Sequence, residues 1–111
     1  MKKKIYVAIP YSGNEEKNFK IANEVTAKLM DDGHIPFSPI SHSHPIAIQC
    51  QVPGTWEYWE EFDRSFIEWA DELLVVVTNQ EEVDNSKGVQ AEMNIAKELN
   101  KPINFYQYDR I

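Results

Sequence analysis

Four short apolar runs along the chain have the composition of buried β-strands. They lie at residues 5–9, 35–37, 72–77 and 102–106. The run at 72–77 is apolar almost throughout, which is typical of a strand in a parallel sheet covered on both faces. Pro36 removes a backbone donor from the short run at 35–37, so we expect that strand toward the edge of the sheet.

Three segments between these runs carry apolar residues at helical spacing. They cover residues 15–32, 56–70 and 88–100, and the pattern repeats every three to four positions. Asp32 and Gly33 end the first helix, Thr55 can cap the second, and Asn85 or Ser86 can cap the third. The alternation predicts an α/β fold with a doubly wound, flavodoxin- or Rossmann-like parallel sheet of four to five strands flanked by helices. At 111 residues, we expect a single domain over residues 1–111.

Residues 38–55 show neither periodicity. The segment contains Pro39, Pro45 and Pro53, together with His42 and His44. We therefore predict a long loop, and loops of this length in compact domains are usually functional or act as lids. In doubly wound sheets, ligands bind beyond the carboxyl ends of the strands. That edge would be built from residues 10–15, 38–55 and 78–88.

Two of the predicted helices each carry one acid on their apolar face. Glu92 lies between Val89 and Met93 on the third helix, and Asp63 lies among aromatic residues on the second. A buried carboxylate is costly unless it is paired or used. Because both helices flank the strand at 72–77, the two acids can converge on one polar pocket. The alternative for Asp63 is a structural role, with Arg64 or a backbone amide as its partner.

The glycine one turn before Glu92 supports a pocket at this place. Helix side chains lean toward the N-terminus, so Glu92 reaches back over Gly88. Glycine destabilises a helix relative to alanine, which indicates that the space beside it is needed. Paired carboxylates suit reactions at the anomeric carbon of a sugar, where one acts as nucleophile or charge stabiliser and the other handles protons or orients the sugar. Apolar surroundings would raise the pKa of whichever acid lacks a donor.

Composition narrows the classes of partner. The net charge of −7 argues against a nucleic-acid polymer, because no basic face can be assembled, although a small nucleotide needs only a few local donors. No apolar run reaches membrane-spanning length or resembles a signal peptide, and Cys50 is the single cysteine. We therefore expect an intracellular, cytoplasmic protein without a membrane partner, a disulfide or a cysteine metal cluster.

The pair His42 and His44 forms a His-x-His sequence, but metal binding needs a third ligand, for which only His34 or a distant acid is available. We predict no metal and no cofactor. His42 is a candidate contact for a phosphate or a base, and an ordinary role in the loop is the alternative. Trp56 and Trp59 can stack on a base, or they can serve core or dimer packing. For Tyr6 the alternative to a place in the pocket is a buried tyrosine bonded to a backbone carbonyl.

Several segments, in order, resemble the nucleoside 2-deoxyribosyltransferase superfamily. Residues 6–12 are similar to its first strand and loop, Asp63 with residues 70–76 to its Asp-helix-Ala-Asp-strand segment, and Ser86-x-Gly88-Val89-x-x-Glu92 to its signature. A short branch also shares Trp56, Trp59 and the segment 39–42. In the 2′-deoxynucleoside 5′-monophosphate N-glycosidases, a Ser stands at the position of Ser86, where the nucleoside transferases have an Asp.

The resemblance implies a site. Glu92 would be the nucleophile, Asp63 would orient the sugar or support proton transfer, and Tyr6 would position Glu92. The 5′ end of a nucleoside or nucleotide would be held by Ser86 and Gly88, with contacts from the first loop at Pro10, Tyr11, Ser12 and Gly13. The superfamily forms homodimers or larger homo-oligomers, so we expect one here. This chain departs from the family where Val77, Thr78 and Asn79 replace its Leu-Asp-Gly.

Three functions remain open at this point. The first is cleavage or transfer at the N-glycosidic bond of a (deoxy)nucleoside or its 5′-monophosphate. The second is a non-catalytic module that binds or senses a nucleotide in the same pocket. The third is a protein-interaction domain that uses the acidic surface and the tryptophan-rich helix.

Overall fold

The computed structural model describes residues 2–108 of the chain. Its centre is a four-stranded, fully parallel sheet in the order β2-β1-β3-β4. The strands are β1 (Lys4–Ala8), β2 (Ile35–Phe37), β3 (Glu72–Val77) and β4 (Ile103–Gln107). The predicted doubly wound α/β fold is confirmed, and the proline-containing run at 35–37 is an edge strand as expected.

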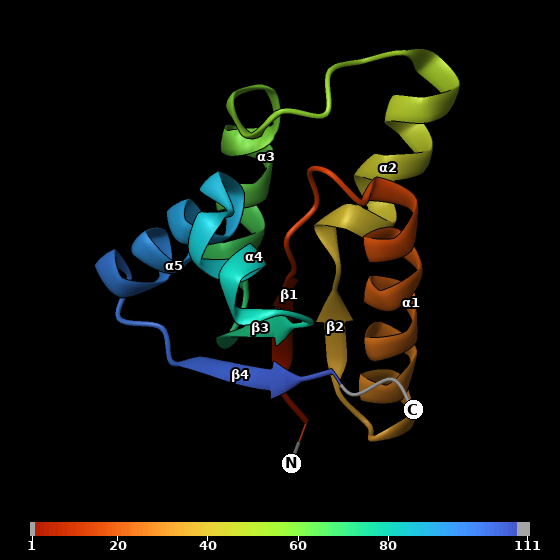
Figure 1. The fold of residues 1–111 in the computed structure, drawn as a ribbon. Coiled ribbons are helices and arrows are strands. Elements are labelled where there is room, and N and C mark those ends of the chain that lie inside the picture. The colour runs from red at the N-terminus through yellow and green to blue at the C-terminus, as the bar shows by residue number, and fades with distance from the viewer. Residues whose placement is uncertain (1, 109–111) are drawn as a thin grey trace.

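Five helices connect and flank the strands. They are α1 (Glu15–Asp31), α2 (Pro39–Cys50), α3 (Trp56–Trp69), α4 (Gln80–Asn85) and α5 (Lys87–Glu98). Figure 1 shows α1 on one side of the sheet and α3 and α5 on the other, which is the arrangement that right-handed crossovers produce. The three helices expected from apolar periodicity are all present at nearly the expected bounds.

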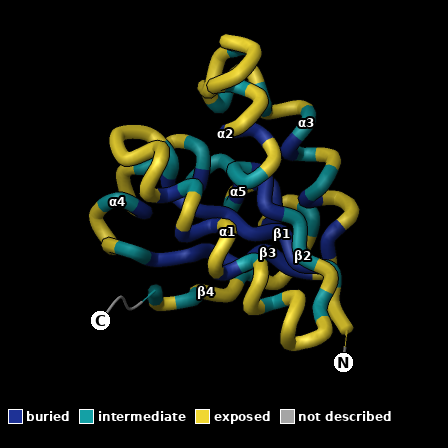
Figure 2. Tube along the Cα trace, turned by 90° about the vertical axis from the view of Figure 1, so that its right-hand side faces the viewer, coloured by how far each residue is buried: buried dark blue, intermediate teal, exposed yellow. Residues whose placement is uncertain are grey.

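The sheet separates two apolar cores. Tyr6, Ala8 and the odd-numbered residues of β3 pack against α3, α4 and α5. Ile5, Val7 and Ile9, with Leu74 and Val76 of β3, pack against α1. β3 is buried along its whole length because it contributes alternate side chains to both cores. Figure 2 shows the buried positions concentrated along the strands, with exposed positions on the outer turns of the helices.

The prediction of a loop over residues 38–55 is wrong, because twelve of these residues form α2. Ser38 caps the helix by accepting a hydrogen bond from the Ser41 amide at 3.3 Å, and Pro39 occupies the first turn, where its fixed φ favours a helix. Pro45 lies inside the helix and removes only one backbone hydrogen bond. Gln51, with φ of 58°, ends the helix in the left-handed conformation.

A further element that the sequence pattern did not predict is the short helix α4 between β3 and α5. Asn79 caps it by accepting hydrogen bonds from the amides of Glu81 and Glu82. The connection at residues 51–55 runs from α2 across to α3 (Figure 1). Within residues 2–108, no helix is long and apolar enough to cross a membrane.

Candidate functional site

A cavity of about 650 Å³ opens beyond the carboxyl end of β1. Its walls come from residues within 9–12, 39–47, 54–63 and 79–92, which includes parts of all three regions predicted for the ligand-binding edge. The volume lies in the range typical of sites for small molecules. The fold therefore places a ligand-sized space where doubly wound sheets usually bind their ligands.

Glu92 lies on the second turn of α5 and is 5% exposed. Ser86 fixes the start of this helix, since its hydroxyl accepts a hydrogen bond from the Val89 amide at 3.2 Å. The Glu92 carboxylate lines the cavity and accepts a hydrogen bond from the Tyr6 hydroxyl. Burial raises the pKa of Glu92 to about 8, with a further rise from the charge of Asp63, while the hydrogen bond from Tyr6 opposes the shift.

Tyr6 is fully buried in β1, beneath the cavity. Its partner is Glu92, so the alternative of a bond to a backbone carbonyl does not describe its hydroxyl. Burial and the charges of Glu92 and Asp63 raise the pKa of Tyr6 well above its ordinary value. The hydroxyl therefore stays protonated and acts as a permanent donor to Glu92.

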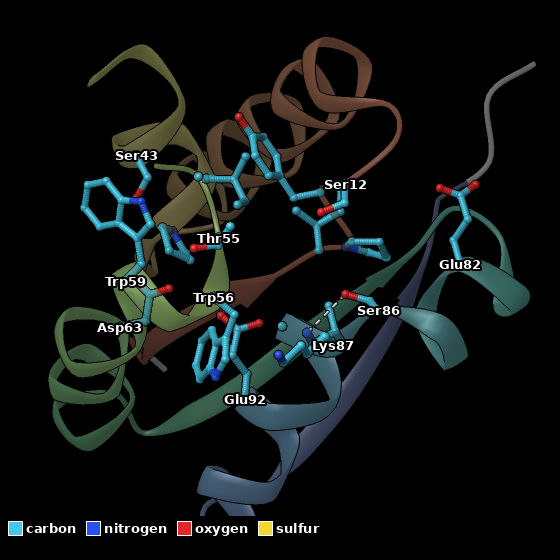
Figure 3. A pocket seen from close by; sticks show the side chains of 18 of the residues that line it. Ser12, Ser43, Thr55, Trp56, Trp59, Asp63, Glu82, Ser86, Lys87 and Glu92 are labelled. Carbon is cyan, nitrogen blue, oxygen red and sulfur yellow. Dashed lines mark hydrogen bonds between the residues drawn. The ribbon is translucent and has the colours of Figure 1, made fainter. Parts of the chain in front are cut away.

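Asp63 lies on α3 and is 6% exposed. Its Oδ1 atom is buried and has no hydrogen-bond partner among residues 2–108. Burial raises the pKa of Asp63 to about 7. The structural alternative of a pair with Arg64 does not describe the fold, because the Arg64 guanidinium lies 3.1 Å from Glu98. Figure 3 shows that Asp63 and Glu92 come from different helices and line the same cavity, as their sequence pattern predicts.

The N-termini of α3 and α5 meet at one side of the cavity. Lys87 forms an ion pair with Glu57 across them, and both residues line the cavity. A Cβ atom added to Gly88 would lie 3.9 Å from Cε3 of Trp56, which is ordinary van der Waals contact. An alanine would therefore fit here without strain, and the space beside Gly88 is bounded by the Trp56 ring.

The sequence-predicted binding residues divide into two groups. Those that line the cavity are Pro10, Tyr11, Ser12, Ser86 and Gly88. Gly13 and His42 are not among the lining residues. The Gly13 amide donates to Glu15 at 3.1 Å, and the His42 ring stacks on Phe62 with centroids 5.0 Å apart.

Among the other lining residues are two indoles, a serine hydroxyl and an imidazole that the predicted site did not include. Trp56 and Trp59 line the cavity, although the sequence left base stacking and packing open for them. Ser43 and His44 of α2 line it as well. Ser43 is buried, and its hydroxyl has no hydrogen-bond partner within the described chain. The capping signal Ser38-Pro39 could have identified α2, and with it the side on which His44 faces.

His44 is 5% exposed and is held on both ring nitrogens. Nδ1 lies 2.5 Å from the Tyr11 hydroxyl, and Nε2 lies 3.2 Å from Oε1 of Glu16. The ring also packs on Phe19, with centroids 4.5 Å apart. Tyr11 has a raised pKa because of its burial and the charges of Glu15 and Glu16. The α2 side of the cavity is therefore an ordered network of a phenol, an imidazole and a carboxylate.

No cluster of three or more His, Cys, Asp or Glu side chains suited to a metal ion occurs in the part of the chain that the structure describes. The polar side chains that line the cavity include hydroxyls, indoles, an imidazole and carboxylates. Two of the carboxylates lie close enough together for the charge of one to raise the pKa of the other. Such a pair can handle protons and act on an electrophilic carbon.

Comparison with known proteins places these features in context. A family described as a domain of unknown function, DUF1937, matches residues 3–108. Among solved structures, the chain is similar to a 2-deoxyribosyltransferase from the psychrotolerant bacterium Bacillus psychrosaccharolyticus, described as a biocatalyst for the synthesis of nucleosides. The TM-score is 0.66 at 24% identity, over 97% of this chain and 76% of the other. The search of curated proteins found no match.

Proposed function

The chain belongs to the DUF1937 family, and on that premise we propose that it cleaves or transfers the N-glycosidic bond of a (deoxy)nucleoside or a nucleoside 5′-monophosphate, with Glu92 as nucleophile. The observation that carries the proposal is the buried Glu92 carboxylate, which lines the cavity together with Asp63 and has the Tyr6 hydroxyl as its donor. The likeness of the fold to a 2-deoxyribosyltransferase supports the choice of a nucleoside over other glycosides.

The proposed reaction has two steps. A carboxylate oxygen of Glu92 attacks C1′ of the sugar, the C1′–N bond breaks, and the base leaves with the bonding electron pair and takes up a proton from an acid of the site or from solvent. Water or a second base then attacks C1′ and releases Glu92. Glu92 must be ionised to attack, so the Tyr6 hydrogen bond, which lowers its pKa, favours the reactive form.

Asp63 fits the role of orienting the sugar or supporting proton transfer. Its buried Oδ1 has no partner among the described residues, so a sugar hydroxyl or a base nitrogen could supply one. Its pKa of about 7 means that both the neutral and the charged form are accessible near neutral pH. A group in that position can either donate or accept a proton.

The 5′ end of the substrate would lie at the start of α5. Ser86 and Gly88 line the cavity there, and the first amides of a helix are favourable donors to an anion. The donors at the start of α5 can hold a 5′-hydroxyl or a 5′-phosphate, and Trp56 and Trp59 offer apolar surfaces for the rest of the molecule. Ser12 lies across from Ser86 in Figure 3, on the opposite side of this space.

The proposal is tested by release of free base from a panel of nucleosides, 2′-deoxynucleosides and their 5′-monophosphates. Chromatography of the reaction mixture distinguishes hydrolysis from transfer when a second base is added. The wild-type protein should release base from at least one member. Undiminished release by Glu92→Ala would exclude Glu92 as the nucleophile.

A second candidate is a module that binds a nucleotide without turnover. The raised pKa of Glu92, about 8, favours it, because a largely protonated carboxyl group at neutral pH donates a hydrogen bond well but is a poor nucleophile. In that case a nucleotide would raise the melting temperature of the protein, while no base would be released over several hours. The Glu92→Ala variant would then lose the thermal shift.

A further inference from the structure

Tyr11, His44 and Glu16 form a hydrogen-bonded relay of three side chains, and the role proposed for this relay rests on the proposed function above. The relay begins at Tyr11, which lines the cavity, and continues through the buried ring of His44. It ends at Glu16, whose side chain is 64% exposed. Its two contacts are 2.5 Å and 3.2 Å long. It thus joins the cavity wall to the solvent through an imidazole that is fixed at both ends.

The chemistry of the three groups fixes where the protons lie. The Glu16 carboxylate can only accept, so Nε2 of His44 carries a hydrogen. When the ring is neutral, Nδ1 is an acceptor and the Tyr11 hydroxyl points at it. When the ring is protonated, Nδ1 donates to the Tyr11 oxygen, and the Tyr11 hydrogen is free to point into the cavity. The protonation of His44 therefore decides whether Tyr11 offers the cavity a donor.

The location suits the group that leaves the sugar. Figure 3 shows Ser12 and Ser43 on the side of the cavity away from Glu92, and Tyr11 and His44 line the cavity from the same two segments, the loop after β1 and helix α2. A nucleophile and a leaving group lie on opposite faces of the carbon that they share in a displacement. The departing base therefore belongs on the Tyr11 side when Glu92 attacks C1′.

We propose that Tyr11, backed by protonated His44, is the general acid that protonates the departing nucleobase. As the C1′–N bond breaks, its electrons go to the base and the Tyr11 hydroxyl proton goes to a ring nitrogen of that base. The Nδ1 proton of the His44 imidazolium moves to the Tyr11 oxygen. His44 regains a proton from water once the base has left, and Glu16 holds the ring in place. Tyr11 is catalytic in this scheme, whereas His44 and Glu16 position and recharge it.

The test compares two substrates that differ in their need for an acid. The base of 2′-deoxyguanosine requires a proton to leave, whereas that of 7-methyl-2′-deoxyguanosine is already cationic and leaves neutral. Tyr11→Phe and His44→Gln should lower kcat for 2′-deoxyguanosine by about 100-fold and for the methylated substrate by less than about threefold, with KM little changed in both. Tyr58→Phe removes the same hydroxyl from an exposed tyrosine outside the cavity lining and should change neither rate.

The pH profile of the wild-type protein gives a second readout that needs no variant. The charged and titratable groups that contact or act on His44 are Tyr11, Glu15 and Glu16. The profile for 2′-deoxyguanosine should contain a descending limb that the profile for the methylated substrate lacks, because only 2′-deoxyguanosine needs the proton that Tyr11 and His44 supply. The ascending limb from the ionisation of Glu92 should appear for both substrates.

The outcomes separate this proposal from the proposed function. Equal losses of kcat on the two substrates, or coincident pH profiles, would show that Tyr11, His44 and Glu16 only support the structure of the cavity wall. That result would overturn the inference but not the proposed function, because base would still be released. A loss confined to 2′-deoxyguanosine in Asp63→Asn, with none in Tyr11→Phe or His44→Gln, would place the acid on Asp63. If the wild-type protein released base from neither compound nor from any member of the wider panel, the proposed function itself would fall.

Discussion

The two sides of the cavity hold their polar groups in opposite ways. On the side built by α3 and α5, Glu92 has the Tyr6 hydroxyl as its hydrogen-bond donor, and Oδ1 of Asp63 has no partner within residues 2–108. Burial raises the pKa of both acids. On the side built by α2, both nitrogens of His44 are bonded, and the ring is packed on Phe19.

This difference separates groups that cost stability from groups that support the fold. A buried acid that lacks partners destabilises the folded state in the absence of a ligand. A buried imidazole with two partners does not carry that penalty. The contrast indicates that the acids on the α3–α5 side are completed by a substrate, whereas the Tyr11–His44–Glu16 network is complete before a substrate arrives.

The largest expected effect is on Glu92. Glu92→Gln keeps the shape of the side chain but removes the nucleophile, so base release should fall by at least about 1000-fold. Kinetic assays of base release measure the loss. Glu98→Gln on the same helix alters an exposed acid that pairs with Arg64, and its activity should stay near that of the wild-type protein. If Glu92→Gln retained a tenth of the wild-type activity, Glu92 would not be the nucleophile, and the α3–α5 side would no longer differ from the α2 side in the way described.

Tyr6 should have the next largest effect, because it supplies the hydrogen bond to Glu92. In Tyr6→Phe the pKa of Glu92 rises further, since the bond that lowers it is gone. Fewer molecules then hold an ionised Glu92 at pH 7, and activity should fall by roughly 10- to 100-fold. The ascending limb of the pH–rate profile should shift to higher pH. An unshifted limb with a lower plateau would mean that Tyr6 acts by packing alone.

Asp63 gives a prediction on stability. Its folded pKa of about 7 exceeds the ordinary value of 3.8, so the folded state holds a proton that the unfolded state releases between these pH values. The contribution of Asp63 to stability is therefore most favourable below about pH 4 and declines as pH rises to about 7.

The Asp63→Asn variant lacks this ionisation. The difference in the free energy of unfolding between Asp63→Asn and the wild-type protein should shift in favour of the variant by about 2–4 kcal/mol when the pH is raised from 4 to 8. Denaturant titrations at the two pH values measure the change, and Asp84→Asn on the exposed face of α4 should show none. A difference between Asp63→Asn and wild type that stays constant with pH would contradict the assignment of Asp63 as a buried, unpartnered acid.

Gly88 tests whether the open space is used by the ligand. In Gly88→Ala the new Cβ meets Trp56 only at ordinary contact distance, and alanine is the better helix former by up to about 1 kcal/mol. The melting temperature should therefore stay the same or rise, while KM rises several-fold. An unchanged KM would show that the substrate does not occupy the space beside α5.

The smallest effect is expected at His42, which faces Phe62 rather than the cavity lining. His42→Ala should lose about 0.5–1 kcal/mol of stability from the ring contact and leave kcat and KM unchanged. Thermal unfolding and base-release assays on the same preparation measure both quantities. A large loss of activity would show that His42 takes part in the site, and it would contradict the view that only His44 of the two histidines of α2 faces the cavity.

The strands, the three amphipathic helices and both acids could be predicted because each leaves a periodic signal. Asp63 and Glu92 stand out since they interrupt apolar faces of period 3.6. The residues of β3 stand out since they form an unbroken apolar run. These signals depend only on neighbours along the chain.

The α2 side could not be predicted in the same way. Its apolar residues are spread around the helix, with Ile46 and Ile48 exposed, and its prolines favour the interpretation as a loop. Without a helix, the choice between His42 and His44 has no geometric basis. The partners of His44 lie about thirty positions away along the chain, at Tyr11 and Glu16, so only the fold brings them together.

The account is tested most directly by trapping the sugar on the protein. A 2′-deoxy-2′-fluoro nucleoside slows the second step of a displacement at C1′, so mass spectrometry of the intact protein and its peptides can identify the attacked residue. We expect a mass increase of one fluorinated sugar on the peptide that contains Glu92, and no increase in Glu92→Gln. A sugar trapped on a residue other than Glu92 would contradict the assignment of the nucleophile. Undiminished base release by Glu92→Gln would contradict it as well.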